Sequence, residues 1–187
     1  MIIYRNAILI PKQDPDPEQY DASLEPEEGD ELASDSFPCV KVDDVVYKFT
    51  LRNRTDKDSD NFDIGANQSQ EEVAETTDTA ETKGLDCVLN HRLEPVAIKN
   101  AKQFKLYIKK YGGEMKKVMA AKYTGEEAAA RLGKIQKVFR FLLEDFDNCE
   151  FFSGEHYNQD GTLLMVHWDG AQPNGYLVID GVGEEKQ

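Results

Sequence analysis

The sequence has no apolar run that approaches the ~20 residues of a membrane-spanning helix. It also lacks the pattern of a secretory signal. Residues 1–5 are apolar without a basic n-region, and the first apolar run ends at Ile10, before Pro11. These absences predict a cytoplasmic protein with no membrane span.

Cysteine is scarce, with three residues spaced far apart: Cys39, Cys87 and Cys149. An odd number of widely separated cysteines does not make a disulfide framework, so free thiols in a reducing compartment are predicted. The three histidines are also scattered, and none lies within two residues of a cysteine. Because a zinc site needs four convergent ligands, usually in closely spaced pairs, the sequence does not favour one.

Sequence motifs for catalysis are missing as well. There is no phosphate-binding Gly-rich loop with its lysine, no nucleophile elbow and no zinc-protease helix. Gly181-Val182-Gly183 is too short for a dinucleotide fingerprint and stands near the wrong end of the chain. The sequence therefore predicts a binding protein with no catalytic site and no required cofactor.

Basic residues are few, 22 against 36 acidic ones, which gives a net charge of −14 over 187 residues. The charge is uneven. Residues 13–40 hold ten carboxylates and no Lys or Arg, and residues 55–86 have a net charge of −8, whereas residues 92–140 have a net charge of +9. Such polarisation steers charged partners, and an acidic chain is a poor candidate for nucleic-acid binding. Protein partners are predicted instead.

Strands are predicted at both ends of the chain, so the fold is expected to be α+β and mainly β. The apolar residues of 45–51 alternate, and residues 39–42 and 45–51 form a hairpin around Asp43-Asp44. Residues 181–187 are expected to fray. Further strands are predicted at 2–10, 85–89, 150–152, 162–168 and 176–179, with tight turns at Asp160-Gly161, Asp169-Gly170 and Asn174-Gly175.

Two polar segments interrupt this pattern within what we take as a single domain, 1–187. Residues 11–29 are rich in Pro, Asp and Glu, and we expect them to form a mobile acidic insertion. Residues 53–84 contain almost no large apolar groups and are expected to form a long mobile acidic loop.

An antiparallel helical hairpin is predicted over 97–147. Its first helix, about 99–122, has an apolar stripe at spacings of four and three, and Gly112-Gly113 in its middle predicts a kink or soft point. The second helix starts at Thr124, with Glu127 in a capping-box position. The first apolar stripe is Phe104, Ile108, Tyr111, Met115 and Val118, and the second is Ala128, Leu132, Ile135, Phe139, Leu142 and Phe146.

Lysines lie largely off the stripe of the first helix. One interpretation of such a row is a solvated face, which is the usual outcome. The other, in an acidic protein, is a docking surface for an acidic partner, and both interpretations stay open. Lys102, Lys105 and Lys109 are the residues on which this surface rests.

Asp56, Asp58 and Asp60 match the first three ligand positions of a calcium-binding helical loop. The sixth position is Asn61 where glycine is needed, and the twelfth is Asn67 where a bidentate glutamate is needed. A solvated acidic loop is one interpretation, and weak calcium binding is the other.

Several local patterns occur in the order found in one family. The chain resembles the translationally controlled tumour protein (TCTP) family across almost its whole length. The matching segments are MIIYR at 1–5, DELASD at 30–35, IGANQS at 64–69, LDCVLNH at 85–91 and FFSGE at 151–155. Residues 11–29 look like an insertion that the family usually lacks.

The resemblance implies a small twisted β-tent with a protruding helical hairpin, in a monomeric, non-enzymatic cytosolic adaptor linked to growth and translation. It implies Rheb-type small GTPases, elongation-factor exchange complexes, tubulin and anti-apoptotic proteins as partners, with calcium binding. By position, Glu31 is the implied GTPase contact and Ser69 a phosphorylation candidate.

The family's fold also resembles that of methionine sulfoxide reductases. A thiol-dependent reductase using Cys87 or Cys149 is therefore the alternative function, although neither cysteine has a resolving cysteine nearby in sequence.

Overall fold

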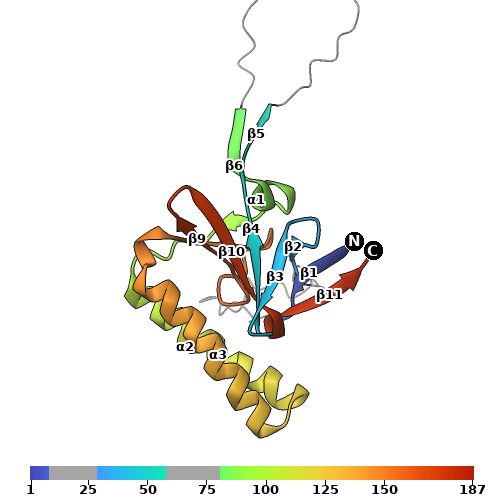
Figure 1. Cartoon of the computed structure of the whole chain (residues 1–187), viewed down its shortest axis with the longest axis vertical. Helices are drawn as coiled ribbons and strands as arrows, with labels where there is room; N and C mark the ends of the chain where they lie inside the picture. Colours follow the sequence, from blue (N-terminus) through green and yellow to red (C-terminus); the bar gives the residue numbers. More distant parts are fainter. Residues whose placement is uncertain (9–28, 58–80) are drawn as a thin grey trace, which may run out of the picture.

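The computed structural model describes residues 1–8, 29–57 and 81–187, and its body is built from antiparallel sheets (Figure 1). The largest sheet has the strand order β3-β4-β10-β9-β8-β7. A second has the order β11-β1-β2, and β5 pairs with β6. The strands are β1 (Ile2–Asn6), β2 (Glu31–Ser34), β3 (Cys39–Val42), β4 (Val46–Thr50), β5 (Asn53–Lys57), β6 (Glu81–Leu85), β7 (Glu94–Pro95), β8 (Cys149–Ser153), β9 (Leu164–Asp169), β10 (Gln172–Val178) and β11 (Val182–Lys186).

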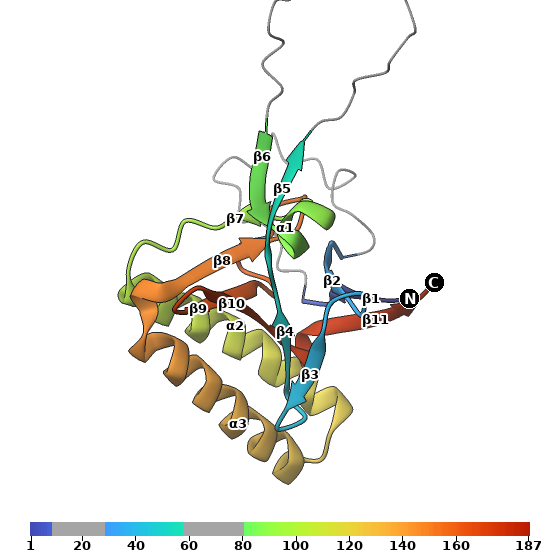
Figure 2. The same ribbon diagram turned by 45° about the horizontal axis from the view of Figure 1, so that its top comes forward.

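Two long helices form the predicted hairpin. α2 (Ala101–Lys122) begins where the side chain of Asn100 accepts a hydrogen bond from the backbone N–H of Gln103, at 2.9 Å. α3 (Gly125–Glu144) begins after Thr124, whose hydroxyl donates to a Glu127 carboxylate oxygen at 3.1 Å. The two helices lie side by side in both ribbon views (Figures 1 and 2). The short helices are α1 (Asp86–Asn90), η2 (Phe146–Asn148) and η3 (Ile179–Gly181).

Two hydrophobic cores lie on opposite faces of the six-stranded sheet. The first packs the helices against one face, with Phe104, Phe139 and Met165 buried in it. The second lies on the other face, under the three-stranded sheet and α1, and includes Leu164 and Val166. Strand β9 therefore sends alternate side chains into different cores, which explains why its apolar residues do not alternate with polar ones.

The β3–β4 hairpin was predicted from Asp43-Asp44, and the structure confirms it. Both aspartates have positive φ, 51° and 57°, which aspartate tolerates better than most residues. Arg131 and Lys134 of α3 donate hydrogen bonds to the carbonyl oxygens of Asp44 and Asp43, at 2.8 and 3.2 Å. The turn thereby joins the helical hairpin to the sheet.

A buried carboxylate makes a second connection between α3 and the body. Asp180 is 2% exposed and accepts hydrogen bonds from Tyr123 Oη at 2.8 Å and from Arg131 Nε at 2.9 Å. The Arg131 guanidinium lies over the Tyr123 ring, 4.7 Å from its centroid. The carboxylate is therefore both charge-paired and hydrogen-bonded, as a buried charge requires.

The prediction of a strand at 85–89 was wrong, because β6 ends at Leu85 and α1 follows. The side chain of Asp86 accepts hydrogen bonds from the backbone N–H groups of Cys87 and Arg52, at 2.9 and 3.1 Å. These bonds turn the chain into a helix. A five-residue apolar run cannot distinguish helix from strand by its periodicity.

The ends of the predicted 53–84 loop are also ordered as strands. β5 and β6 pair from Asn53 opposite Leu85 to Lys57 opposite Glu81. Backbone hydrogen bonds form this ladder from polar residues, so hydrophobicity gave no signal of it. The predicted 11–29 insertion lies outside the described residues, apart from Gly29.

Two further predictions in the C-terminal region were wrong. Asn174-Gly175 is not a turn but lies inside β10, where a Cβ on Gly175 would lie 3.2 Å from the side chains of Leu51 and Leu164. The glycine is needed there for packing. Residues 182–186 do not fray but pair as β11 with β1, so the N- and C-termini meet.

The predicted kink or soft point does not interrupt α2, which continues as one helix through Gly112 and Gly113. Buried Tyr111 and Met115 on either side of the glycines hold the helix against the first core.

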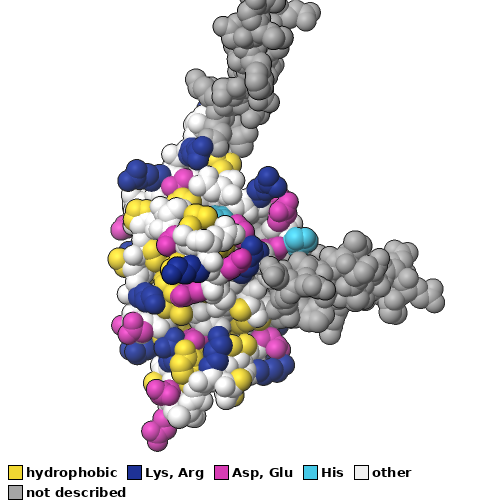
Figure 3. Space-filling view, turned by 90° about the vertical axis from the view of Figure 1, so that its right-hand side faces the viewer, with side chains coloured by type: hydrophobic (Ala, Val, Ile, Leu, Met, Phe, Trp, Pro, Cys, Tyr) yellow, Lys and Arg dark blue, Asp and Glu magenta, His cyan; other side chains and the backbone are white. Residues whose placement is uncertain are grey.

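Among the described helices, none is long and apolar enough to cross a bilayer. The face shown in Figure 3 mixes basic and acidic side chains with small apolar areas.

Candidate functional site

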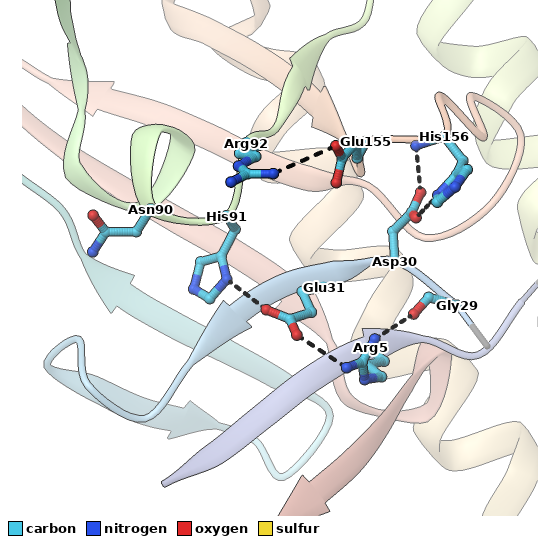
Figure 4. Close-up of a pocket in the computed structure, with 9 residues that line it drawn as sticks. All are labelled: Arg5, Gly29, Asp30, Glu31, Asn90, His91, Arg92, Glu155 and His156. Atoms are coloured by element: carbon cyan, nitrogen blue, oxygen red, sulfur yellow. Dashed lines mark hydrogen bonds and ion pairs between the residues drawn. The ribbon is translucent and has the colours of Figure 1, made fainter. Parts of the chain in front are cut away.

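A charged pocket of about 480 Å³ lies where four separate segments of the chain meet (Figure 4). Strand β1, the start of β2, the end of α1 and the loop after β8 each supply side chains to it. The residues that line it are Arg5, Gly29, Asp30, Glu31, Asn90, His91, Arg92, Glu155 and His156.

Glu31 lies between two basic side chains of this pocket. Its Oε1 accepts a hydrogen bond from Arg5 Nη2 at 3.0 Å, and its Oε2 lies 3.5 Å from His91 Nδ1. Arg5 also bonds Glu185 and the carbonyl oxygen of Gly29. The Glu31 side chain is 36% exposed, so it is fixed in place yet open to solvent.

His91 is the buried member of the pocket, with its side chain 8% exposed and its ring edge-to-face with Phe37. Neither ring nitrogen has a hydrogen-bond partner among the described residues, because the 3.5 Å contact with Glu31 is too long for a good hydrogen bond. Burial lowers the pKa of His91, and Glu31 opposes that shift only in part. A neutral imidazole with unused hydrogen-bonding capacity therefore faces Glu31.

Asp30 is buried beside Glu31 and anchors the loop after β8. Its carboxylate contacts His156 Nδ1 and accepts a hydrogen bond from the His156 backbone N–H at 3.0 Å. A Cβ on Gly154 would lie 2.0 Å from the Cβ of Asp30, so only glycine permits this approach. The loop in turn carries Glu155, whose carboxylate lies 3.8 Å from Arg92.

The charged lining of the pocket is suited to binding a charged group. Each of its three carboxylates already contacts a basic side chain, and a partner's charged group can exchange with these contacts. The lining residues include no hydroxyl or thiol nucleophile. Within the described parts of the chain, no three His, Cys, Asp or Glu side chains are arranged to hold a metal ion.

Sequence reasoning named one residue of this pocket, Glu31. It missed Arg5, Asp30, His91 and Glu155, although each lies in one of the four segments quoted above at 1–5, 30–35, 85–91 and 151–155. Their convergence in space was the missing information, and the order of these segments along the chain does not show it.

The lysines of the predicted docking surface lie together on α2. Lys102, Lys105 and Lys109 are all exposed. The stripe opposite them is buried at Phe104, Tyr107, Tyr111, Met115 and Met119, so the sequence stripe missed Tyr107 and Met119, while Ile108 and Val118 are only half-buried.

Most of the predicted calcium ligands cannot be placed. Asp56 lies in β5 opposite Thr82, whereas Asp58 and Asp60 lie outside the described residues. Ser69, the phosphorylation candidate, also lies outside them.

The structure gives no support to the thiol alternative. Cys87 is fully buried and its Sγ contacts the carbonyl oxygen of Leu32 at 3.6 Å, and burial raises the pKa of this thiol. Cys149 contacts two backbone carbonyl oxygens, and burial raises its pKa to about 12. Nucleophilic cysteines need the opposite, a stabilised thiolate.

Comparison with known proteins gives consistent matches in sequence and structure. Residues 27–183 match the family model described as translationally controlled tumour protein. The chain is 36% identical over 160 residues to the translationally-controlled tumor protein homolog of Lumbricus rubellus, and 36% identical over 165 residues to that of Bombyx mori. Each match covers 84% of this chain and 94% of the relative.

Two solved structures share the fold. The translationally controlled tumor-associated protein p23fyp from Schizosaccharomyces pombe matches with a TM-score of 0.71 and 25% identity, covering all of both chains. The translationally-controlled tumor protein from Caenorhabditis elegans matches with a TM-score of 0.66 and 30% identity, covering 100% of this chain and 99% of that one.

Proposed function

Because the chain belongs to the translationally controlled tumour protein family, we propose that it is a non-enzymatic cytoplasmic adaptor linked to growth and translation. Its partners are proteins, among them a Rheb-type small GTPase, an elongation-factor exchange complex and tubulin. Weak calcium binding at Asp56, Asp58 and Asp60 and phosphorylation at Ser69 belong to the same proposal.

One observation supports this proposal most directly, namely the setting of Glu31. A carboxylate fixed by Arg5, 36% exposed and backed by a buried neutral histidine is ready to meet a basic group of a partner. In this proposal the pocket is the GTPase contact. The exposed lysines of α2 form a second contact, for the acidic surface of tubulin or of the exchange complex.

The pocket is tested by measuring the affinity of the chain for a Rheb-type GTPase by calorimetry. Glu31→Gln keeps the side-chain shape and removes the charge, and we expect it to weaken binding by at least about tenfold. Glu126→Gln is the matched control, since Glu126 is exposed on α3 and does not line the pocket. Equal affinities for wild type and Glu31→Gln would show that the charge of Glu31 does not contribute to the interface.

A further inference from the structure

The side of α2 that faces away from the body has a repeating pattern of its own. The buried residues Phe104, Tyr107, Tyr111, Met115 and Met119 occupy one side of the helix. At 3.6 residues per turn, positions spaced four and three apart from Lys102 lie on the opposite side. This outer stripe consists of Lys102, Leu106, Lys109, Gly113 and Lys116.

Leu106 is the apolar member of the outer stripe, and 57% of it is exposed. Three of its four neighbours on the helix surface are lysines, at positions 102, 109 and 110, and the fourth is Gln103; Lys105 precedes it in the sequence. Lys110 pairs with Asp160, whereas none of the other three forms an ion pair within the described part of the chain. An exposed leucine thus lies among four lysines.

Gly113 lies two turns beyond Leu106 on the same stripe. Glycine inside a helix costs about 1 kcal/mol relative to alanine, so its presence needs a reason. The packing of the body gives none, because a Cβ placed on Gly113 meets no atom within 4 Å. The residue leaves a notch of bare backbone beside Lys109 and Lys116.

We propose that this outer stripe binds an acidic protein segment that presents one large apolar side chain, with Leu106 and the Gly113 notch as its seat. An apolar centre inside a charged rim is the usual anatomy of a protein interface. The proposal rests on the lysine surface described above and adds the residues that determine its specificity. A single exposed leucine fits a side-chain-sized contact, whereas a membrane-surface helix needs a broad apolar face.

Two fluorescent peptides test the stripe by polarisation at physiological ionic strength: an oligoglutamate, and the same peptide with one central phenylalanine. We expect the full chain to bind the phenylalanine peptide about tenfold more tightly than the oligoglutamate. Leu106→Ser abolishes this preference and leaves oligoglutamate binding unchanged. Val40→Ser, which alters a residue 60% exposed on β3, is the matched control and retains the preference.

Gly113→Gln separates binding from folding. Because glutamine is the better helix former, this variant should melt at a higher temperature than wild type, yet lose the preference for the phenylalanine peptide. Retention of the preference by both Leu106→Ser and Gly113→Gln would contradict the proposed binding role of the outer stripe.

The other outcomes distinguish the stripe from the lysine surface on which it rests. Equal binding of both peptides by wild type would contradict the proposed role of the outer stripe, but not the proposed role of the lysine surface. If wild type binds neither peptide, the proposed roles of the outer stripe and of the lysine surface are both contradicted. Leu106-dependent binding to vesicles of equal parts phosphatidylcholine and phosphatidylserine, without a peptide preference, would replace the protein segment by a lipid surface.

Discussion

Asp180 joins the helical hairpin to the body through its bonds with Arg131 and Tyr123, in addition to the contacts at the Asp43-Asp44 turn. Arg131→Met leaves this carboxylate buried without its cation, and we expect the free energy of unfolding to fall by about 3 kcal/mol. Urea denaturation measures this change.

Lys117→Met is the control for that measurement. It removes an exposed pair with Glu114, which contributes less than about 1 kcal/mol. Adding Asp180→Asn to Arg131→Met should recover part of the loss by removing the unpaired charge. Similar small losses for Arg131→Met and Lys117→Met would contradict the role given to Asp180.

His91 makes the stability of the fold depend on pH. In the unfolded chain its pKa is about 6.5, and burial lowers the pKa in the folded chain. Between these two values the unfolded chain binds more protons, so the free energy of unfolding falls as pH drops through this range. We expect the loss between about pH 7.5 and about pH 5.5 to be smaller in His91→Phe than in wild type.

Val40→Ser, which changes an exposed side chain of β3 and removes no titratable group, supplies the control for the pH measurement and should show the same dependence on pH as wild type. An unchanged pH dependence in His91→Phe would show that another group titrates.

Single residues also show where sequence reasoning reached its limit. Glu31 was identified through a family resemblance, and the structure places it in the pocket. Arg5 and His91 were not identified, because they meet Glu31 across 26 and 60 positions of the chain. Nothing in local composition indicates such a contact.

Elements whose signals are local were predicted well. The apolar spacing gave α2 and α3 within a few residues, and Asp43-Asp44 gave the β3–β4 turn. β11 was missed because its sequence, VGEEK, has no apolar alternation and its partner β1 lies at the other end of the chain. Pairing of this kind is fixed by backbone hydrogen bonds rather than by hydrophobic pattern.

Gly112 offers a prediction at the level of the helix. The structure shows no atom within 4 Å of a Cβ placed there, so alanine fits without a clash. We expect Gly112→Ala to raise the free energy of unfolding by about 1 kcal/mol, as measured by urea denaturation. A loss of stability would indicate that the helix needs to bend at this point.

The whole molecule presents two charged contacts that share no residue. The pocket around Glu31 draws on β1, β2, α1 and the loop after β8, whereas the lysine surface lies on α2. An adaptor requires such a separation, because two partners must bind one chain at once. The acidic segments that give the chain its net charge of −14 lie mostly outside the described residues.

Bridging between partners is the most direct test of the adaptor. A Rheb-type GTPase is sedimented with microtubules in the presence of the chain, and we expect wild type to carry the GTPase into the pellet. Glu31→Gln should leave the chain in the pellet without the GTPase, and Lys102, Lys105 and Lys109 changed together to glutamate should leave both in the supernatant. A pellet containing equal GTPase with wild type and with both variants would contradict the account.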